Sequence, residues 1–400
     1  MRDFVKIERT EECCGCGACV CVCPRGAVSM CEDPAGFTFP RVDESLCVRC
    51  GKCVDVCVFT DRFVGANGDP AVYAAVTNDS AILSESSSGG VFTELANAVI
   101  DRGGVVFGAA WTDDLSVAHI RVDSKDELKK LRGSKYVQSS TGDTFRQVKE
   151  LLKDGVPVCY SGTPCQIAGL KSYVGDADDG LLTVDIICHG VPSTKMLHDD
   201  LEAVSGAKIS DIDRVSFRDK SFGWDKKTGR IVSGKGTKKY STVTSPYYFF
   251  FLKGEVFRDS CYNCRFPSEG RQGDITLGDY WGIDRELVSQ LGADPDKGIS
   301  CVLANTENGR KWLADIGERL TLVASDRKSV ERKNVQLTRS SAPLPEHETL
   351  LEGYKINGYS AIRNGFKNRS KDRLIGALKN IMPSKLKRAI ANTVSSIKGK

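Results

Sequence analysis

A cysteine run that occurs twice near the start of the chain constrains the fold more than any other feature of the sequence. The first run has the spacing C-x2-C-x2-C-x3-C and consists of Cys13, Cys16, Cys19 and Cys23. The second run has the same spacing and consists of Cys47, Cys50, Cys53 and Cys57. Three thiolates this close together can bind one face of an iron-sulfur cube, and the glycines between them let the backbone bend around it. The repeat therefore predicts two [4Fe-4S] clusters.

Each run supplies three neighbouring ligands, so the fourth ligand of each cluster has to come from elsewhere. In bacterial two-cluster ferredoxins it comes from the other run. This rule predicts a site I made of Cys13, Cys16, Cys19 and Cys57, and a site II made of Cys47, Cys50, Cys53 and Cys23. A zinc ribbon is the alternative, although zinc needs four ligands and has no use for two complete runs. Cys14, Cys21 and Cys31 fall outside the pattern and have no predicted role.

The composition indicates a soluble protein that works in a reducing compartment. The chain lacks an uninterrupted apolar run long enough to cross a bilayer, and its first twelve residues lack the apolar stretch of a secretory signal. We therefore expect a cytosolic protein. Thiol buffers keep ordinary disulfides reduced there, so the 17 cysteines are better explained by metal binding.

The rest of the chain shows alternating strand and helix patterns, which favour an α/β domain. Short apolar segments that read as strands are 72–77, 105–111, 156–162, 181–188 and 274–283. Segments with helical periodicity are 91–103, 125–133, 144–155 and 163–174, and residues 230–241 read as a surface hairpin. The expected fold is α+β / α/β. It comprises a bacterial ferredoxin-like two-cluster module (1–65), a larger α/β domain in two parts (70–150 and 151–340), and a basic helical tail (341–400).

Two turns in this domain are rich in small polar residues. Residues 84–90 (SESSSGG) precede the helix predicted from Val91, and a helix N-terminus can bind an anion such as a pyrophosphate. A simple helix cap explains the same residues. Residues 132–139 (RGSKYVQS) place Lys135 among small residues, where it can hold a phosphate or face solvent.

Four cysteines of the larger domain lie at expected ends of strands and helices. They are Cys165, Cys188, Cys261 and Cys264. Loop ends at one edge of an α/β sheet can converge, so these thiols can form a third [4Fe-4S] site, called site III below. Buried apolar cysteines and a zinc knuckle at Cys261 and Cys264 explain them equally well. Cys159 and Cys301 read as ordinary core residues.

Taken together, these motifs resemble the family of coenzyme F420 hydrogenase/dehydrogenase beta subunits over about Thr10 to Ile283. The segments that carry the resemblance are the double cysteine run, SSSGGVFTELA, RGSKYVQS, SGTPCQIAGLK, DIICHGVPS and CYNCRF followed by GDITLGDYWG. The resemblance implies an iron-sulfur flavoprotein that binds FAD, with site III as its third cluster. It also implies the flavin contacts Ser87, Ser88, Gly89, Gly90, Gly133, Ser134, Lys135 and Tyr136.

His189 follows Cys188 directly. It can donate a hydrogen bond to a cluster sulfide, act as a catalytic proton donor near the flavin, or simply lie at the surface.

The predicted function is an oxidoreductase. Electrons from ferredoxin or another low-potential donor would pass through the clusters to FAD and on to a small organic or coenzyme acceptor. An electron-relay subunit that serves a partner oxidoreductase is the alternative, and a cluster-based redox sensor is a third hypothesis. Relatives that share a framework can act on different molecules, so the acceptor stays open.

The end of the chain is strongly basic and amphipathic. Residues 365–400 hold ten Lys and Arg against one Asp, and Pro383 separates two short segments with apolar residues at helical spacing. Such a tail suits peripheral contact with an anionic membrane at its cytoplasmic face, docking on a protein, or ordinary helix packing. Nucleic-acid binding is disfavoured, because one short basic end without a recognised motif is a small electrostatic footprint.

Overall fold

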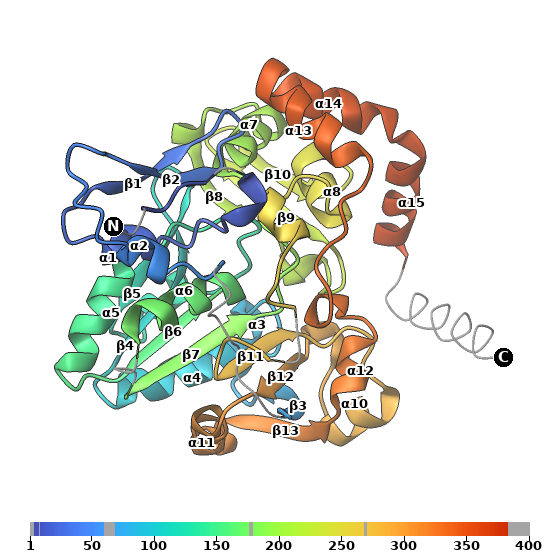
Figure 1. Cartoon of the computed structure of the whole chain (residues 1–400). Helices are drawn as coiled ribbons and strands as arrows, with labels where there is room; N and C mark the ends of the chain where they lie inside the picture. The colour runs from blue at the N-terminus through green and yellow to red at the C-terminus, as the bar shows by residue number, and fades with distance from the viewer. Residues whose placement is uncertain (1–3, 8, 60–68, 176–178, 268–269, 383–400) are drawn as a thin grey trace.

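The computed structural model describes residues 4–7, 9–59, 69–175, 179–267 and 270–382. Its centre is an eight-stranded mixed sheet, seen in the lower half of Figure 1. In spatial order the strands are β13 (Leu320–Ser325), β3 (Ala71–Thr77), β12 (Ser300–Ala304), β11 (Ile275–Asp279), β7 (Leu181–Ile186), β6 (Val158–Gly162), β4 (Val105–Trp111) and β5 (Val117–Val122). The four strands β11, β7, β6 and β4 are parallel, and the strands outside them pair in antiparallel fashion. The predicted α/β class is confirmed.

Helices cover both faces of this sheet. The apolar sides of α4 (Val91–Asp101) and α11 (Glu307–Asp315) pack on one face. The helices α5 (Thr144–Lys153) and α6 (Pro164–Val174) pack on the other face, where Phe107 and Tyr160 point. Strands buried on both sides read as continuous apolar runs, which is why β4, β6 and β7 are recognisable in the sequence. The helix α6 begins with a capping box between Thr163 and Gln166, so its start is locally encoded.

The cysteine-rich module lies against α5 and α6, as the blue part of Figure 1 shows. It consists of α1 (Ala18–Val22), β1 (Val28–Glu32), β2 (Thr38–Val42) and α2 (Lys52–Asp55), with β1 and β2 paired as an antiparallel hairpin. The guanidinium of Arg146 in α5 donates hydrogen bonds to the carbonyls of Cys21 (2.9 Å) and Val20 (2.8 Å). The hydroxyl of Ser172 in α6 donates to the carbonyl of Val56 at 2.9 Å. These contacts attach the module to the larger domain.

A second lobe is built on a three-stranded antiparallel sheet of β8 (Ile212–Ser216), β9 (Thr228–Ser233) and β10 (Gly236–Ser241). The expected hairpin at 230–241 is β9 and β10. An aromatic core joins this sheet to α7 (Thr194–Ser205), α8 (Pro246–Lys253), α13 (Glu346–Asn357) and α14 (Tyr359–Asn368). The remaining helices are α3 (Ser80–Glu85), α9 (Asp259–Tyr262), α10 (Arg285–Leu291), α12 (Arg327–Glu331) and α15 (Ser370–Ile381).

The segment 125–133 and the C-terminal tail can be compared with what their sequence patterns predict. The helix expected at 125–133 is only a short 3-10 helix at Glu127–Lys130. In the tail, α15 exposes Leu374 (63%), Ile375 (51%) and Leu378 (58%), while the second amphipathic segment expected after Pro383 lies outside the described residues. Within the described ranges, no helix combines the length and the apolar character needed to cross a bilayer.

Candidate functional site

The four cysteines predicted for site I line one cavity between α1, β1, β2 and the end of the second cysteine run. These residues are Cys13, Cys16, Cys19 and Cys57. Gly17 has a left-handed backbone (φ 79°) and forms the N-cap of α1, so the chain turns sharply between two of the ligands. The Gly15 amide donates to the Cys13 sulfur at 3.4 Å. The fold thus places three cysteines of the first run with the last cysteine of the second.

The four cysteines predicted for site II line a second cavity. They are Cys23, Cys47, Cys50 and Cys53. Backbone amides point at three of their sulfurs: Ala27 N–H at Cys23 (3.3 Å), Arg49 N–H at Cys47 (3.4 Å) and Val5 N–H at Cys53 (3.3 Å). Cys50 is exposed, so this site lies at the surface of the module.

The electrostatics of site I fit a bound metal cluster. Burial raises the pKa of the Cys19 thiol, and the neighbouring Cys16, Cys13 and Cys57 raise it further. Four thiols packed this closely repel one another as thiolates, so they ionise together only when a cation compensates the charge. Within the described ranges, no three His, Cys, Asp or Glu side chains are grouped as ligands of a single metal ion.

The cysteines predicted for site III come together from three distant parts of the chain. Cys165 lies in the first turn of α6, Cys188 follows β7, and Cys261 and Cys264 lie in and after α9. Burial raises the pKa of the Cys188 thiol, and Cys261, Cys165 and Cys264 raise it further because they lie close to it. The Thr163 hydroxyl lies 3.1 Å from the Cys165 sulfur. The set is therefore assembled by tertiary packing of the sheet edge.

Sites I and III are neighbours, and Cys14 lies between them. The Cys14 thiol packs in one cluster with Cys16 and Cys165, and its proximity lowers the pKa of the Cys165 thiol to about 7. A small apolar cluster of Val58, Ala168 and Phe266 packs around the same sulfurs. The short helix α1 connects site I to site II, since Cys19 of site I lies in its first turn and Cys23 of site II follows its last residue. The three cysteine sets thus form a row in the order II, I, III.

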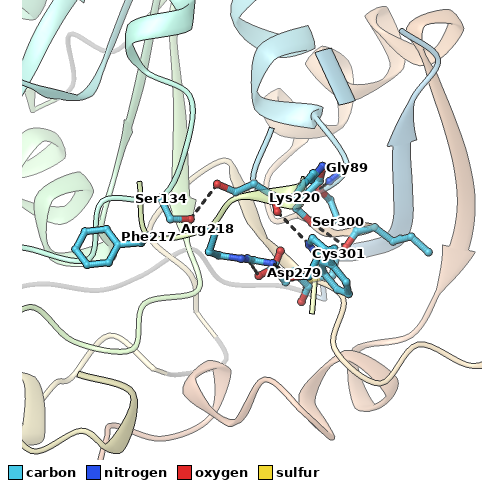
Figure 2. A network of polar contacts seen from close by, with 12 residues as sticks. Gly89, Ser134, Phe217, Arg218, Lys220, Asp279, Ser300 and Cys301 are labelled. Atoms are coloured by element: carbon cyan, nitrogen blue, oxygen red, sulfur yellow. Dashed lines mark hydrogen bonds and ion pairs between the residues drawn. The ribbon is translucent and has the colours of Figure 1, made fainter. Parts of the chain in front are cut away.

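A separate polar site joins the two small-residue turns. The Ser134 hydroxyl donates to the Ser87 hydroxyl at 3.0 Å, so segments 84–90 and 132–139 meet in space (Figure 2). Arg132, two residues before Ser134, pairs with Glu85 through Nη1, and its buried Nε atom finds no hydrogen-bond partner within the described part of the chain. An unsatisfied donor close in sequence to the Ser134 hydroxyl fits a polar ligand such as a phosphate.

The glycines at the start of α4 have mainly structural duties. The Gly89 amide donates to the Ser300 hydroxyl at 2.9 Å, and a Cβ atom at Gly89 would lie 2.2 Å from the Ala75 carbonyl oxygen. Gly90 has a left-handed backbone (φ 85°) and caps the helix. These contacts explain why the segment needs glycines without invoking a ligand. The Ser88 hydroxyl donates to the Ile299 carbonyl at 2.9 Å.

Lys135 and its neighbours Gly133 and Tyr136 make contacts other than the one between Ser134 and Ser87. The Lys135 ammonium donates to the carbonyls of Lys130 (3.2 Å), Leu131 (3.1 Å) and Arg132 (2.9 Å), which ends the short 3-10 helix. Burial lowers the pKa of this ammonium to about 7. The Tyr136 ring stacks on Phe251 at a centroid distance of 4.6 Å, while Gly133 has open space around its Cα. In this conformation Lys135 uses its three donors on the backbone.

The fold adds three residues to the polar site that the sequence patterns did not single out. All come from the loop between β8 and β9: Arg218, Lys220 and Trp224. The Lys220 ammonium donates to the Ser88 carbonyl (3.0 Å), and the Trp224 indole N–H donates to the Ser87 carbonyl (3.0 Å). Arg218 forms a half-buried ion pair with Asp279 at 2.5 Å, and Figure 2 shows the two side chains together. The only local signal for this loop is a cluster of basic and aromatic residues.

His189 lies in an aromatic pocket beside site III. Its ring meets Phe251 and Phe257 edge-on, and its Nδ1 accepts a hydrogen bond from the Gln336 amide at 2.9 Å. Burial lowers the pKa of the ring to about 4, so the imidazole is neutral at pH 7. A neutral, hydrogen-bonded ring is better suited to positioning its neighbours than to releasing a proton.

Several known proteins are similar to this chain in sequence or in structure. A component of the F(420)H(2) dehydrogenase from Methanosarcina mazei is 22% identical over 348 residues, which cover 82% of this chain and 89% of the relative. A coenzyme F420-dependent sulfite reductase from Methanocaldococcus jannaschii is 30% identical over 178 residues, and the match spans 40% of this chain but 24% of that protein. A chain of the F420-reducing [NiFe] hydrogenase complex from Methanosarcina barkeri superimposes with a TM-score of 0.47 at 15% identity, covering 74% of this chain and 96% of the other.

Family models match three stretches of the chain. The 4Fe-4S binding domain matches residues 40–57. The N-terminal and C-terminal models of coenzyme F420 hydrogenase/dehydrogenase beta subunits match residues 72–144 and 157–329, which together make up more than half of the chain. The chain therefore belongs to the family of coenzyme F420 hydrogenase/dehydrogenase beta subunits.

Proposed function

We propose that this protein is an iron-sulfur flavoprotein oxidoreductase. It takes electrons from a ferredoxin-like donor and delivers them to a small organic or coenzyme acceptor. The observation that carries the proposal is the row of three cysteine sets, which runs from the exposed Cys50 to the half-buried Cys188 after β7. When bound, the clusters would supply one-electron transfer, and FAD would exchange two single electrons for one hydride. Two donor molecules are then oxidised for each acceptor that gains two electrons and one proton from solvent.

The surface around site II suits a small acidic electron carrier. Val48 (60% exposed) and Leu46 (43%) are apolar side chains in contact with water, and they flank the exposed Cys50. Arg25 and Lys52 line the same site and are exposed cations. Apolar contacts with surrounding positive charge favour fast and reversible association with a negatively charged protein. We therefore assign the donor to this end of the row.

The polar site suits the phosphate-bearing part of FAD. Ser87 and Ser134 offer hydroxyls, and Arg132, which pairs with Glu85 through Nη1, keeps an unsatisfied Nε donor. Lys220 and Trp224 hold the backbone of segment 84–90 in place from the other lobe. We propose Arg132, Ser87 and Ser134 as the primary contacts, and we give Lys135 and the two capping glycines a supporting role. The role of His189 is then to shape the neighbourhood of site III.

An electron-relay subunit is a second candidate function. One relative is by its name a subunit of a larger dehydrogenase, and the match spans most of both chains. In that case the present chain would hand electrons to a partner oxidoreductase and would have no acceptor site of its own. Bound flavin separates the two hypotheses.

The deciding experiment is anaerobic reconstitution with iron, sulfide and FAD, followed by quantification of all three and electron paramagnetic resonance (EPR) of the reduced protein. We expect about twelve irons per chain, as three [4Fe-4S] clusters require, together with flavin. Cys165→Ala should remove one cluster signal and about four irons. Cys301→Ala is the matched control, because Cys301 is fully buried in β12 and away from the three sites.

The outcomes are distinct. Protein with about eight irons, and a Cys165→Ala variant that loses no signal, would contradict site III. Full iron without flavin would favour the relay. Flavin that ferredoxin reduces, with turnover of an added acceptor, would support the enzyme. Zinc in place of iron in anaerobic material would contradict the whole proposal.

The basic tail supplies a further proposed contact. The stripe of Leu374, Ile375 and Leu378 on α15 is open to solvent, and Lys and Arg are abundant around it. An apolar stripe with flanking cations suits the surface of an anionic membrane. We propose peripheral attachment through this helix.

A further inference from the structure

Arg258 is a buried cation that lies between two of the proposed cluster sites. It is the N-cap residue of α9, and its exposed fraction is 1%. Its Nε donates to the Cys13 carbonyl at 2.6 Å, and its Nη2 donates to the Thr38 carbonyl at 2.8 Å. A Cβ atom at Gly15 would lie 3.2 Å from Nη1. The guanidinium is therefore packed against the loop that carries the first two ligands of site I.

The same residue is joined to site III through its backbone. The Cys261 amide donates to the Arg258 carbonyl, and the Arg258 amide donates to the Val191 carbonyl, three residues beyond Cys188. Arg258 therefore contacts the chain at the first ligand of site I through its guanidinium and at one ligand of site III through its carbonyl. The residue thus lies within electrostatic reach of both sets of thiols.

The partners of this guanidinium are all neutral. Within the described ranges they are two backbone carbonyls, the Gln138 amide oxygen at 3.3 Å, and the rings of Phe39 and Phe37, whose centroids lie 4.1 Å and 6.0 Å from Cζ. Within the described ranges, Arg258 forms no ion pair with a carboxylate. By contrast, Arg271 is equally buried and pairs with Asp185 at 3.2 Å. An isolated buried charge is costly, so a compensating negative charge is expected nearby.

We propose that Arg258 is a positioning residue whose charge raises the reduction potentials of the clusters at sites I and III. This inference rests on the proposed function. A cluster held by four thiolates is an anion, and it gains one more negative charge when it is reduced. A fixed cation nearby stabilises the reduced form more than the oxidised form, and the low dielectric of the interior strengthens this effect. Site II is in contact with solvent and lies outside the contacts of Arg258, so it is affected least.

The test is an EPR-monitored redox titration of the full-length, anaerobically reconstituted protein. In Arg258→Gln, we expect the electron affinity of sites I and III to fall at least about tenfold, which equals a shift of about 59 mV for one electron. Site II should not move and serves as the internal control. Arg258→Lys keeps the charge but loses the planar fork. The electron affinities of sites I and III in this variant should therefore stay within about twofold of those in the original protein.

A third variant tests whether weaker docking of the cysteine-rich module shifts the potential of site III. Arg146→Gln removes two hydrogen bonds between the large domain and α1, and should leave the potential of site III unchanged. Unchanged potentials in a fully loaded Arg258→Gln protein would overturn the inference. So would a downward shift in Arg258→Lys, or a downward shift of site III in Arg146→Gln, as large as that in Arg258→Gln. If Arg258→Gln does not assemble its clusters, the Lys variant decides.

This titration uses chemical reductants and needs neither donor nor acceptor. The measured cluster potentials therefore test the role of Arg258 even if the proposed electron donor or acceptor is wrong. If the original protein shows no third cluster, site III is refuted, and the shift at site I still decides the role of Arg258.

Discussion

Gly169 in α6 offers a sharp test of how the large domain supports site I. A Cβ atom at this position would lie 2.9 Å from the sulfur and 3.0 Å from the Cβ of Cys16. Such contacts are shorter than van der Waals distance, so either the helix or the cysteine has to move. The perturbation is Gly169→Ala, which adds one methyl group at the junction between module and domain.

Two opposing effects set the magnitude. Alanine in a helix interior is normally more stable than glycine by about 1 kcal/mol. Overpacking a tight contact costs about 1–3 kcal/mol. The net expectation is a loss of about 0–2 kcal/mol in the free energy of unfolding. Cys16 can relieve the clash by rotating away, but a ligand that holds a cluster cannot rotate. The main loss should therefore appear in the iron of site I.

The assay measures iron and sulfide per chain and the apparent midpoint of anaerobic guanidinium unfolding. Gly169→Ala should lose up to about four irons, the content of one cluster. Gly376→Ala in α15 is the matched control, because its nearest neighbour would be Thr242 at 3.8 Å. That variant should keep its iron, and its free energy of unfolding should rise by up to about 1 kcal/mol. A Gly169→Ala protein with full iron and a raised midpoint would refute the reasoning.

Three further predictions follow from the same structure. Cys57→Ala should abolish the EPR signal of site I alone and Cys31→Ala none, because Cys57 lines the site I cavity and Cys31 lies outside all three sites; loss of the site II signal instead would contradict crossed ligation. Burial lowers the pKa of His119 to about 4, so its stabilising effect is complete above pH 6.5 and declines as the pH falls towards 4. The free energy of unfolding should therefore fall by about 2 kcal/mol between pH 7 and pH 5, and His119→Gln should remove this fall. If that variant kept the same pH dependence, His119 would not be its cause. Leu378→Glu should reduce co-sedimentation of the full chain with anionic vesicles, whereas equal binding would exclude α15 as the contact.

Much of the module could be predicted from sequence because its ligands are local. Four cysteines at short spacing and glycines between them determine a loop that can wrap a cluster, whatever the rest of the chain does. The same holds for β4, β6 and β7, whose buried apolar runs are readable, and for α6, which carries its own capping box. The strands β12 and β13 were not recognised, because short apolar segments without periodicity are ambiguous.

Tertiary structure decided the features that depend on long-range packing. The segment 125–133 has helical periodicity, yet the Lys135 ammonium caps its carbonyls and ends it after one short 3-10 turn. Site III draws Cys165, Cys188 and Cys264 from three separate elements, and spacing alone left it undecided between a cluster and buried thiols. Arg258 is an ordinary arginine in the sequence. It becomes an uncompensated charge between two sites only because α9 packs against the cysteine-rich module, and burial of this kind is a property of the folded chain alone.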